Sequence, residues 1–195
     1  EDPLLAGKTA AAMINGVESH GVGTSLKHFA VNNQEINRLA NDSRLSLRAL
    51  REIYLRNFEI AVKESQPWTI MTSYNYLNGR YTSEDKGLLE DVLRGEFGFE
   101  GAIVTDWGGG LDAAAQMAAG NDMIQPGEPR HIDVIINAVK NGTLKSSGAH
   151  LIGINTSTKT NKNFSMIFEN VKFSAPSTGA GSAALVYNVW SNTNA

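Results

Sequence analysis

The sequence predicts an α/β fold over residues 1–145, followed by a β-rich segment over residues 146–195. In the first part, segments with apolar residues at helical spacing alternate with short apolar runs, which is the pattern of parallel strands joined by helices. In the second part, runs with partial alternation are separated by Gly, Asn, Ser and Pro, as in antiparallel sheets. Of the 195 residues, 42% are hydrophobic, so the chain is long enough for one domain or two small ones.

The first helix is predicted over residues 4–19, where apolar positions recur at helical spacing until Gly21. A strand over residues 24–31 and a polar loop over residues 32–42 follow. Ser46 is placed to cap the next helix. The later elements are a helix over residues 47–64, a strand over 68–75, a loop over 76–85, a helix over 86–97, a strand over 101–107, a helix over 111–119, a short strand over 122–126 and a helix over 129–140.

Strict alternation of helix and strand predicts parallel strands with right-handed crossovers. Two architectures share this pattern, an open doubly wound sheet and a (β/α)8 barrel, and the four predicted strands would form half of a barrel. The strands predicted within residues 146–195 are too few to close a β-sandwich alone, so this segment is expected to be part of a second module.

Composition excludes several classes of protein. The net charge of -3, with Lys and Arg scattered, provides no large basic surface for nucleic acid or an anionic membrane. No apolar segment approaches the roughly 20 residues that span a bilayer, and we expect a soluble protein, either secreted or cytoplasmic. The absence of cysteine excludes disulfides and thiolate catalysis. The four histidines lie far apart, so neither a metal nor another cofactor is predicted.

Chemically versatile side chains stand where the predicted strands end. Because the carboxyl ends of parallel strands meet at one edge, we expect these side chains to share a pocket. A cation, an imidazole, a phenol, a carboxylate and an indole together suit a small polyhydroxylated ligand such as a sugar. The candidates are Lys27 and His28, Met71 and Tyr74, and Asp106 and Trp107.

Each candidate also has an ordinary structural explanation. Asp106 alone would fit a turn or the N-cap of the next helix, and Lys27 a solvated strand end. His28, Tyr74 and Trp107 would fit packing positions. Their coincidence at the same end of successive strands favours the pocket. A nucleotide-binding fold is disfavoured, because the glycines after Trp107 lack both the P-loop lysine and the dinucleotide fingerprint.

Five segments resemble the catalytic barrel of glycoside hydrolase family 3, the β-glucosidase and exo-glucanase group. They occur in the family's order and cover about residues 1–144: EDPLLAGKTAAAMINGV, KHFAVNNQEINR, SLRALREIYLRNFEIAVKES, IMTSYNYLNG and LLEDVLRGEFGFEGAIVTDW. The resemblance implies a partial (β/α)8 TIM barrel over residues 1–145. It further implies a retaining, exo-acting β-glycosidase of the β-glucosidase type that removes terminal non-reducing β-D-glucosyl residues from β-glucosides or short β-linked oligosaccharides.

The resemblance also assigns roles to the candidate residues. Asp106 matches the nucleophile, while Lys27 and His28 match a Lys-His pair that holds sugar hydroxyls. Met71, Tyr74 and Trp107 match other pocket residues. A retaining glycosidase needs a second carboxyl group about 5 Å from the nucleophile. Tyr74 is expected either to donate a hydrogen bond to Asp106 or to stabilise the transition state.

The sequence departs from the family in three respects. The barrel's opening strands do not precede Glu1, so we expect a processed chain or a fragment. The acid/base glutamate of β-glucosidase-type relatives comes from a separate domain, and another chain or domain would have to supply it, because Glu35, Glu84 and Glu128 do not correspond to it. Residues 146–195 do not continue the family's sequence and are only weakly similar to strands of carbohydrate-binding β-sandwiches.

Two further readings stay open. A β-xylosidase is the nearest enzymatic alternative, since the partial pocket does not define the space around the sugar C6 hydroxymethyl group. A non-catalytic carbohydrate-binding or structural fragment is the alternative from another class. The N-acetylglucosaminidase branch of the family is disfavoured, because its loop histidine has no counterpart after Phe29.

Overall fold

The computed structural model describes residues 2–144, so the boundary predicted at residue 145 and the β-rich segment 146–195 lie outside the described residues. None of the helices within residues 2–144 is long and apolar enough to cross a membrane. The elements in chain order are α1 (Pro3–Glu18), β1 (Ser25–Phe29), β2 (Asp42–Ser43), α2 (Leu47–Ala49), the π-helix η1 (Leu50–Tyr54), α3 (Arg56–Ser65), β3 (Thr69–Thr72), β4 (Tyr76–Leu77), β5 (Arg80–Tyr81), the 3₁₀-helix η2 (Thr82–Glu84), the π-helix η3 (Gly87–Glu96), β6 (Ala102–Val104), α4 (Ala113–Ala119) and α5 (Pro129–Lys140).

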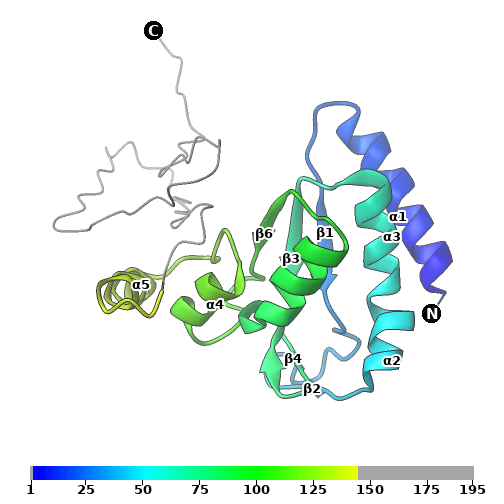
Figure 1. Ribbon diagram of the computed structural model, residues 1–195. Helices are drawn as coiled ribbons and strands as arrows, with labels where there is room; N and C mark the ends of the chain where they lie inside the picture. The colour runs from blue at the N-terminus through cyan, green and yellow to red at the C-terminus, as the bar shows by residue number, and fades with distance from the viewer. Residues whose placement is uncertain (1, 145–195) are drawn as a thin grey trace, which may run out of the picture.

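A parallel three-stranded sheet in the order β1-β3-β6 forms the centre of the fold (Figure 1). The helices that join its strands confirm the predicted α/β class, while the partial (β/α)8 barrel stays a prediction. The fourth strand, predicted over residues 122–126, is reduced to a single parallel bridge between Met123 and Val104. The pairing ends there because Gln125 donates its main-chain N–H to the Thr105 hydroxyl and Pro126 has no N–H to donate.

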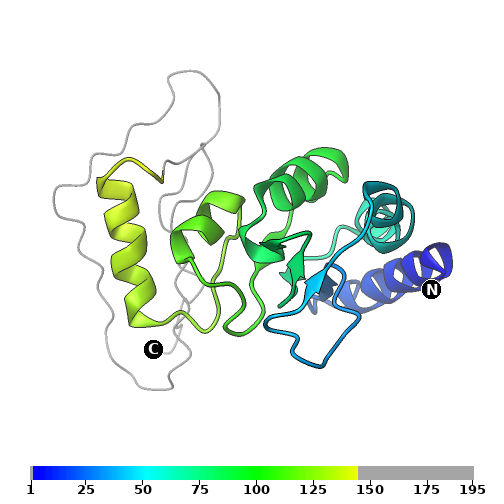
Figure 2. The ribbon, with the colours of Figure 1, turned by 90° about the horizontal axis from the view of Figure 1, so that it is seen from below.

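The helices begin and end close to the predicted positions. Asp2 caps α1 by accepting from the main-chain N–H groups of Leu4 and Leu5, and Ser46 caps α2 as predicted. The helix predicted over residues 47–64 is divided into α2, η1 and α3, because the N–H of Leu55 donates five residues back, to Leu50. In Figures 1 and 2, α1 and α3 run side by side at one end of the fold, with α5 at the other.

A second, small sheet lies almost entirely within the residues predicted as loops, with Ser43 just beyond them. β4 pairs with β2 in parallel and with β5 in antiparallel orientation. Asn78 and Gly79 form the two-residue turn of this hairpin, and both have the positive φ angles that such a turn requires, 51° and 89°. The rings of Tyr76 and Tyr81 stack across it with centroids 3.7 Å apart.

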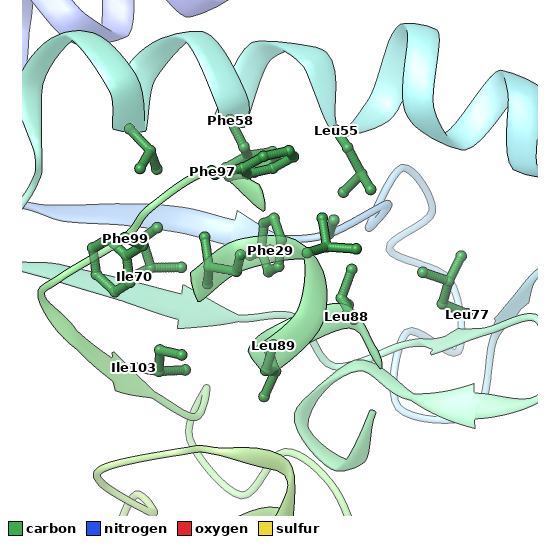
Figure 3. Packing of buried hydrophobic residues seen from close by; sticks show 14 of the residues in the cluster. Phe29, Leu55, Phe58, Ile70, Leu77, Leu88, Leu89, Phe97, Phe99 and Ile103 are labelled. Carbon is green, nitrogen blue, oxygen red and sulfur yellow. The ribbon is translucent and has the colours of Figure 1, made fainter. Parts of the chain in front are cut away.

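The hydrophobic core fills the space between the parallel sheet, α3 and η3 (Figure 3). Phe29, Ile70 and Ile103, one from each strand, are fully buried. The ring of Phe58 on α3 meets that of Phe29 edge to face, with centroids 5.0 Å apart. The strand that delivers His28 to the candidate site is therefore fixed by the aromatic residue directly after it.

Glu18 ties together three segments at the amino-terminal end of the sheet. One of its carboxylate oxygens accepts from the Thr24 N–H at 3.1 Å, the Thr24 hydroxyl at 2.6 Å and the Trp68 N–H at 3.0 Å. Burial acts to raise the pKa of Glu18, but these hydrogen bonds outweigh it and lower that pKa below its ordinary value. Glu18 thus links the end of α1 to the starts of β1 and β3.

Gly101 occupies a position at which a side chain would meet backbone. A Cβ atom there would lie 2.5 Å from the Trp68 carbonyl oxygen and 2.6 Å from that of Pro67. We expect Gly101→Ala to lower the free energy of unfolding, measured by urea denaturation, by about 1–3 kcal/mol. The matched control is Gly16→Ala in α1, where nothing lies within 4 Å. That change should stabilise by about 0.5–1 kcal/mol, and equal effects of the two substitutions would contradict the packing described here.

Candidate active site

Asp106 lies just after β6, with its side chain only 13% exposed. Its Oδ1 accepts the main-chain N–H of Trp107 at 2.7 Å, and its Oδ2 lies 3.3 Å from Nε2 of His28. The N-cap of α4 is Asp112, which accepts from the N–H groups of Ala114 and Ala115. Asp106 is therefore not the helix cap that its position allows, and its carboxylate is turned toward the end of β1.

His28 stands opposite Asp106 with about a third of its side chain exposed. Burial lowers the pKa of His28, and the positive charges of Lys27 and Arg38 lower it further. The negative charges of Asp106 and Glu35 act in the opposite direction without cancelling this decrease. The neutral imidazole is therefore favoured at neutral pH, in which form a ring N–H can donate to a carboxylate or to a sugar hydroxyl.

Tyr74 is buried close to Asp106. Its hydroxyl donates to the main-chain oxygen of Trp107 at 2.9 Å, so it fixes the backbone that follows Asp106. Burial raises the pKa of Tyr74, and the nearby charge of Asp106 raises it further. The phenol accordingly stays protonated and remains a donor throughout the neutral range.

Arg38 is a site residue that the sequence reasoning missed. Its guanidinium lies over the ring of Tyr74, 4.7 Å from the centroid. Glu35 holds it there through an ion pair of 2.9 Å, and Asn32 donates to the same carboxylate at 3.0 Å. The segment of Arg38 is predicted as a polar loop and belongs to the motif KHFAVNNQEINR, but no local pattern shows that this side chain reaches Tyr74.

The remaining candidates are less closely grouped. Lys27 is exposed and, with His28, lines a cavity of about 410 Å³ between the end of β1 and the starts of α1 and α3. The Trp107 side chain is 57% exposed, which leaves its indole accessible to a ligand. Met71 is half-buried in β3, paired in register with Val104, and its place in the pocket stays a prediction.

The structure thus brings His28, Tyr74, Asp106 and Trp107 together, adds Arg38, and places Lys27 beside them. Within residues 2–144 there is no group of three or more His, Asp or Glu side chains that could hold a metal ion. The chemistry available is that of one shielded carboxylate, several hydrogen-bond donors and an exposed indole. This set suits a neutral ligand rich in hydroxyl groups.

The lowered pKa of His28 predicts a pH dependence of stability. The unfolded chain binds this proton more readily than the folded chain, so stability is lowest below the folded-state pKa and rises with pH up to the ordinary value of 6.5. We expect the urea midpoint to rise between about pH 5 and 6.5, and to rise less in His28→Gln. The exposed His20 gives a matched control, His20→Gln. An unchanged rise in His28→Gln would contradict the assignment.

The model of the "Glycosyl hydrolase family 3 N terminal domain" matches residues 1–151 of the chain. An exo-alpha-(1->6)-L-arabinopyranosidase of Bifidobacterium breve is 52% identical over 145 residues, which are 74% of this chain and 19% of that protein. Beta-glucosidase B of Emericella nidulans is 46% identical over 146 residues, 74% of this chain and 17% of that protein.

Among solved structures, beta-glucosidase 3B from Thermotoga neapolitana in complex with glucose matches with a TM-score of 0.73 and 50% identity, over 74% of this chain and 21% of that one. A Bifidobacterium adolescentis GH3 beta-glucosidase matches with a TM-score of 0.72 and 49% identity over the same shares of the two chains. The chain thus spans about a fifth of the length of these relatives.

Proposed function

The chain belongs to glycosyl hydrolase family 3, and from this premise we propose that it carries the nucleophile and part of the sugar pocket of a retaining, exo-acting β-glycosidase. The proposed substrate is a β-glucoside or short β-linked oligosaccharide, from which the terminal non-reducing glucosyl residue is removed. Asp106 is proposed to attack this glucosyl group. The side chains proposed to bind it are Lys27, His28, Met71, Tyr74 and Trp107.

The arrangement around Asp106 is the observation that carries this proposal. The shielded carboxylate of Asp106 accepts a hydrogen bond from the Trp107 N–H through one oxygen, and its other oxygen faces His28. The second oxygen would attack the anomeric carbon, forming a glycosyl ester while the bond to the leaving oxygen breaks. Water would then hydrolyse the ester and release the sugar with its original configuration.

Protonation of the leaving group requires a second carboxyl group. The three glutamates weighed in the sequence for this role are already engaged in other contacts. Glu84 accepts the N–H groups of Leu111 and Asp112, Glu35 pairs with Arg38, and Glu128 pairs with Arg130. We therefore propose that another domain or chain supplies the acid/base glutamate.

Covalent trapping tests the nucleophile separately from the acid. A 2-deoxy-2-fluoro-β-glucosyl fluoride has a leaving group that needs no protonation, while its C2 fluorine slows breakdown of the ester. We expect the 195-residue chain to gain the mass of one fluorosugar, located on the peptide containing Asp106. The matched fluoroxyloside distinguishes the β-xylosidase alternative, which predicts faster labelling by the xyloside. Labelling of another residue would overturn the assignment.

A second candidate function is non-catalytic carbohydrate binding. It is favoured by the exposure of Trp107, whose indole can stack on a sugar ring whether or not Asp106 reacts. Saturable binding of glucose or cellobiose without any labelling of Asp106 would support this function in place of the first.

A further inference from the structure

The turn from Asp106 to Gly110 is attached to the protein by hydrogen bonds from several elements. The Gly108 N–H donates to the Gln125 carbonyl at 2.7 Å, and the Gly109 N–H donates back to the Asp106 carbonyl at 3.0 Å. Tyr74 holds the Trp107 carbonyl from the side of β3. The position of the Asp106 carboxylate thus depends on how firmly this turn is held.

The side chain of Gln116 is hydrogen-bonded to this turn. This side chain of α4 is 3% exposed and donates from Nε2 to the Gly109 carbonyl at 2.6 Å. The backbone runs so close to it that a Cβ atom on Gly110 would lie 2.0 Å from Nε2 of Gln116. Gly110 also has a φ angle of +79°, so both space and conformation require glycine there.

A buried amide fixes the backbone of Gln116. The Asn121 side chain donates to the Gln116 carbonyl at 2.7 Å and to the Ser83 carbonyl at 2.6 Å. Asn121 is 3% exposed and Ser83 is fully buried, so these bonds are shielded from water. The side-chain rotamer of Gln116 is thus restricted by its bond to Gly109, and its backbone by the bond from Asn121. A residue that positions another group requires both restrictions.

We infer that Gln116 is a positioning residue for Asp106, acting through the Gly109 peptide. Its amide fixes the Gly109 carbonyl, the Gly109 N–H fixes the Asp106 carbonyl, and the Asp106 carboxylate is held facing His28. A role of Gln116 in catalysis rests on the proposed function of Asp106 as nucleophile. The positioning of Asp106 by Gln116 does not rest on that function, so it can be tested without substrate.

Gln116→Met tests the inference, because it keeps the length of the side chain and removes the donor. Two NMR measurements on the 195-residue chain report on the turn. We expect the Gly109 amide to exchange with solvent about tenfold faster, while the amide of Ile70 in the central strand is unchanged. We also expect the titration midpoint of His28 to fall, because Asp106 is the attractive charge nearest to it and would be held less firmly.

Lys27, Glu35 and Arg38 also act on the His28 charge, but none of them is hydrogen-bonded to the turn or to Gln116, so they should be unaffected. Gln66→Met is the matched control. Gln66 also donates from Nε2 to a glycine carbonyl, that of Gly98, at 2.9 Å, but beyond the opposite end of the sheet. It should leave both Gly109 exchange and the His28 midpoint unchanged.

A general loss of stability would accelerate exchange at Ile70 as well as at Gly109. This result, or an unchanged His28 midpoint in a folded Gln116→Met chain, would overturn the inference. If Gln116→Met does not fold, the same measurements on Gln116→Leu decide. Leucine fits within the volume of the glutamine and has no donor for the Gly109 carbonyl, so both effects should appear there as well. Trapping at Asp106 is measured separately, so failure of the proposed function would leave this result standing.

Discussion

Replacement of Asp106 by asparagine should lower the rate of hydrolysis of a dinitrophenyl β-glucoside by at least about a thousandfold. The carboxamide has nearly the same shape and can still accept the Trp107 N–H, but it cannot form a glycosyl ester. The loss should therefore appear in kcat, with little change in the concentration of glucose needed for half-saturation. Steady-state kinetics of the purified chain measure kcat, and calorimetric titration measures glucose binding.

A smaller substitution makes this test more specific. Asp106→Gly leaves space beside His28, and we expect added azide to restore part of the rate and to yield an α-glucosyl azide. The matched control is Asp91→Asn, since Asp91 is an exposed aspartate of η3. The assignment of the nucleophile would be contradicted if the Asp106→Asn variant kept its activity. It would also be contradicted if the Asp91→Asn variant lost as much activity as Asp106→Asn.

The largest effect on stability is expected from Leu89→Ala. Leu89 is fully buried on η3, in the core that also contains Phe29 and Ile103 (Figure 3). Truncation removes apolar contacts and leaves a cavity, which together should lower the free energy of unfolding by about 2.7–5 kcal/mol. Guanidinium denaturation followed by circular dichroism measures this difference.

The same substitution at the surface provides the comparison. Leu47, at the start of α2, is 73% exposed, and Leu47→Ala should change the free energy of unfolding by no more than about 0.5 kcal/mol. If the two substitutions were equally costly, η3 would not be packed on the sheet as described.

The sequence predicts the parts of the fold that depend on local pattern. Helical spacing located α1 and α5 within about a residue, and the apolar runs located β1, β3 and β6. The convergence of His28, Tyr74 and Asp106 was also predicted, because parallel strands place their carboxyl ends at one edge of the sheet. This part of the site follows from topology alone.

Other features depend on contacts between distant segments. Arg38 is recognised as a site residue only through its stacking on Tyr74, which no local pattern reveals. The β4–β5 hairpin has the Asn-Gly turn signal, but strands of two residues are too short to show alternation. Helix propensity alone does not locate the π-helical turn at Leu55, which divides a helix that the apolar pattern predicts as continuous.

The three hydrogen bonds of Glu18 and the carboxylate of Asp106 lie at opposite ends of the same sheet. Substitutions aimed at the proposed sugar preference can therefore be made in the loop of residues 32–41, which contains Arg38 beside Tyr74, without changing the residues that anchor the opposite end. The residues that keep the scaffold folded need not be varied.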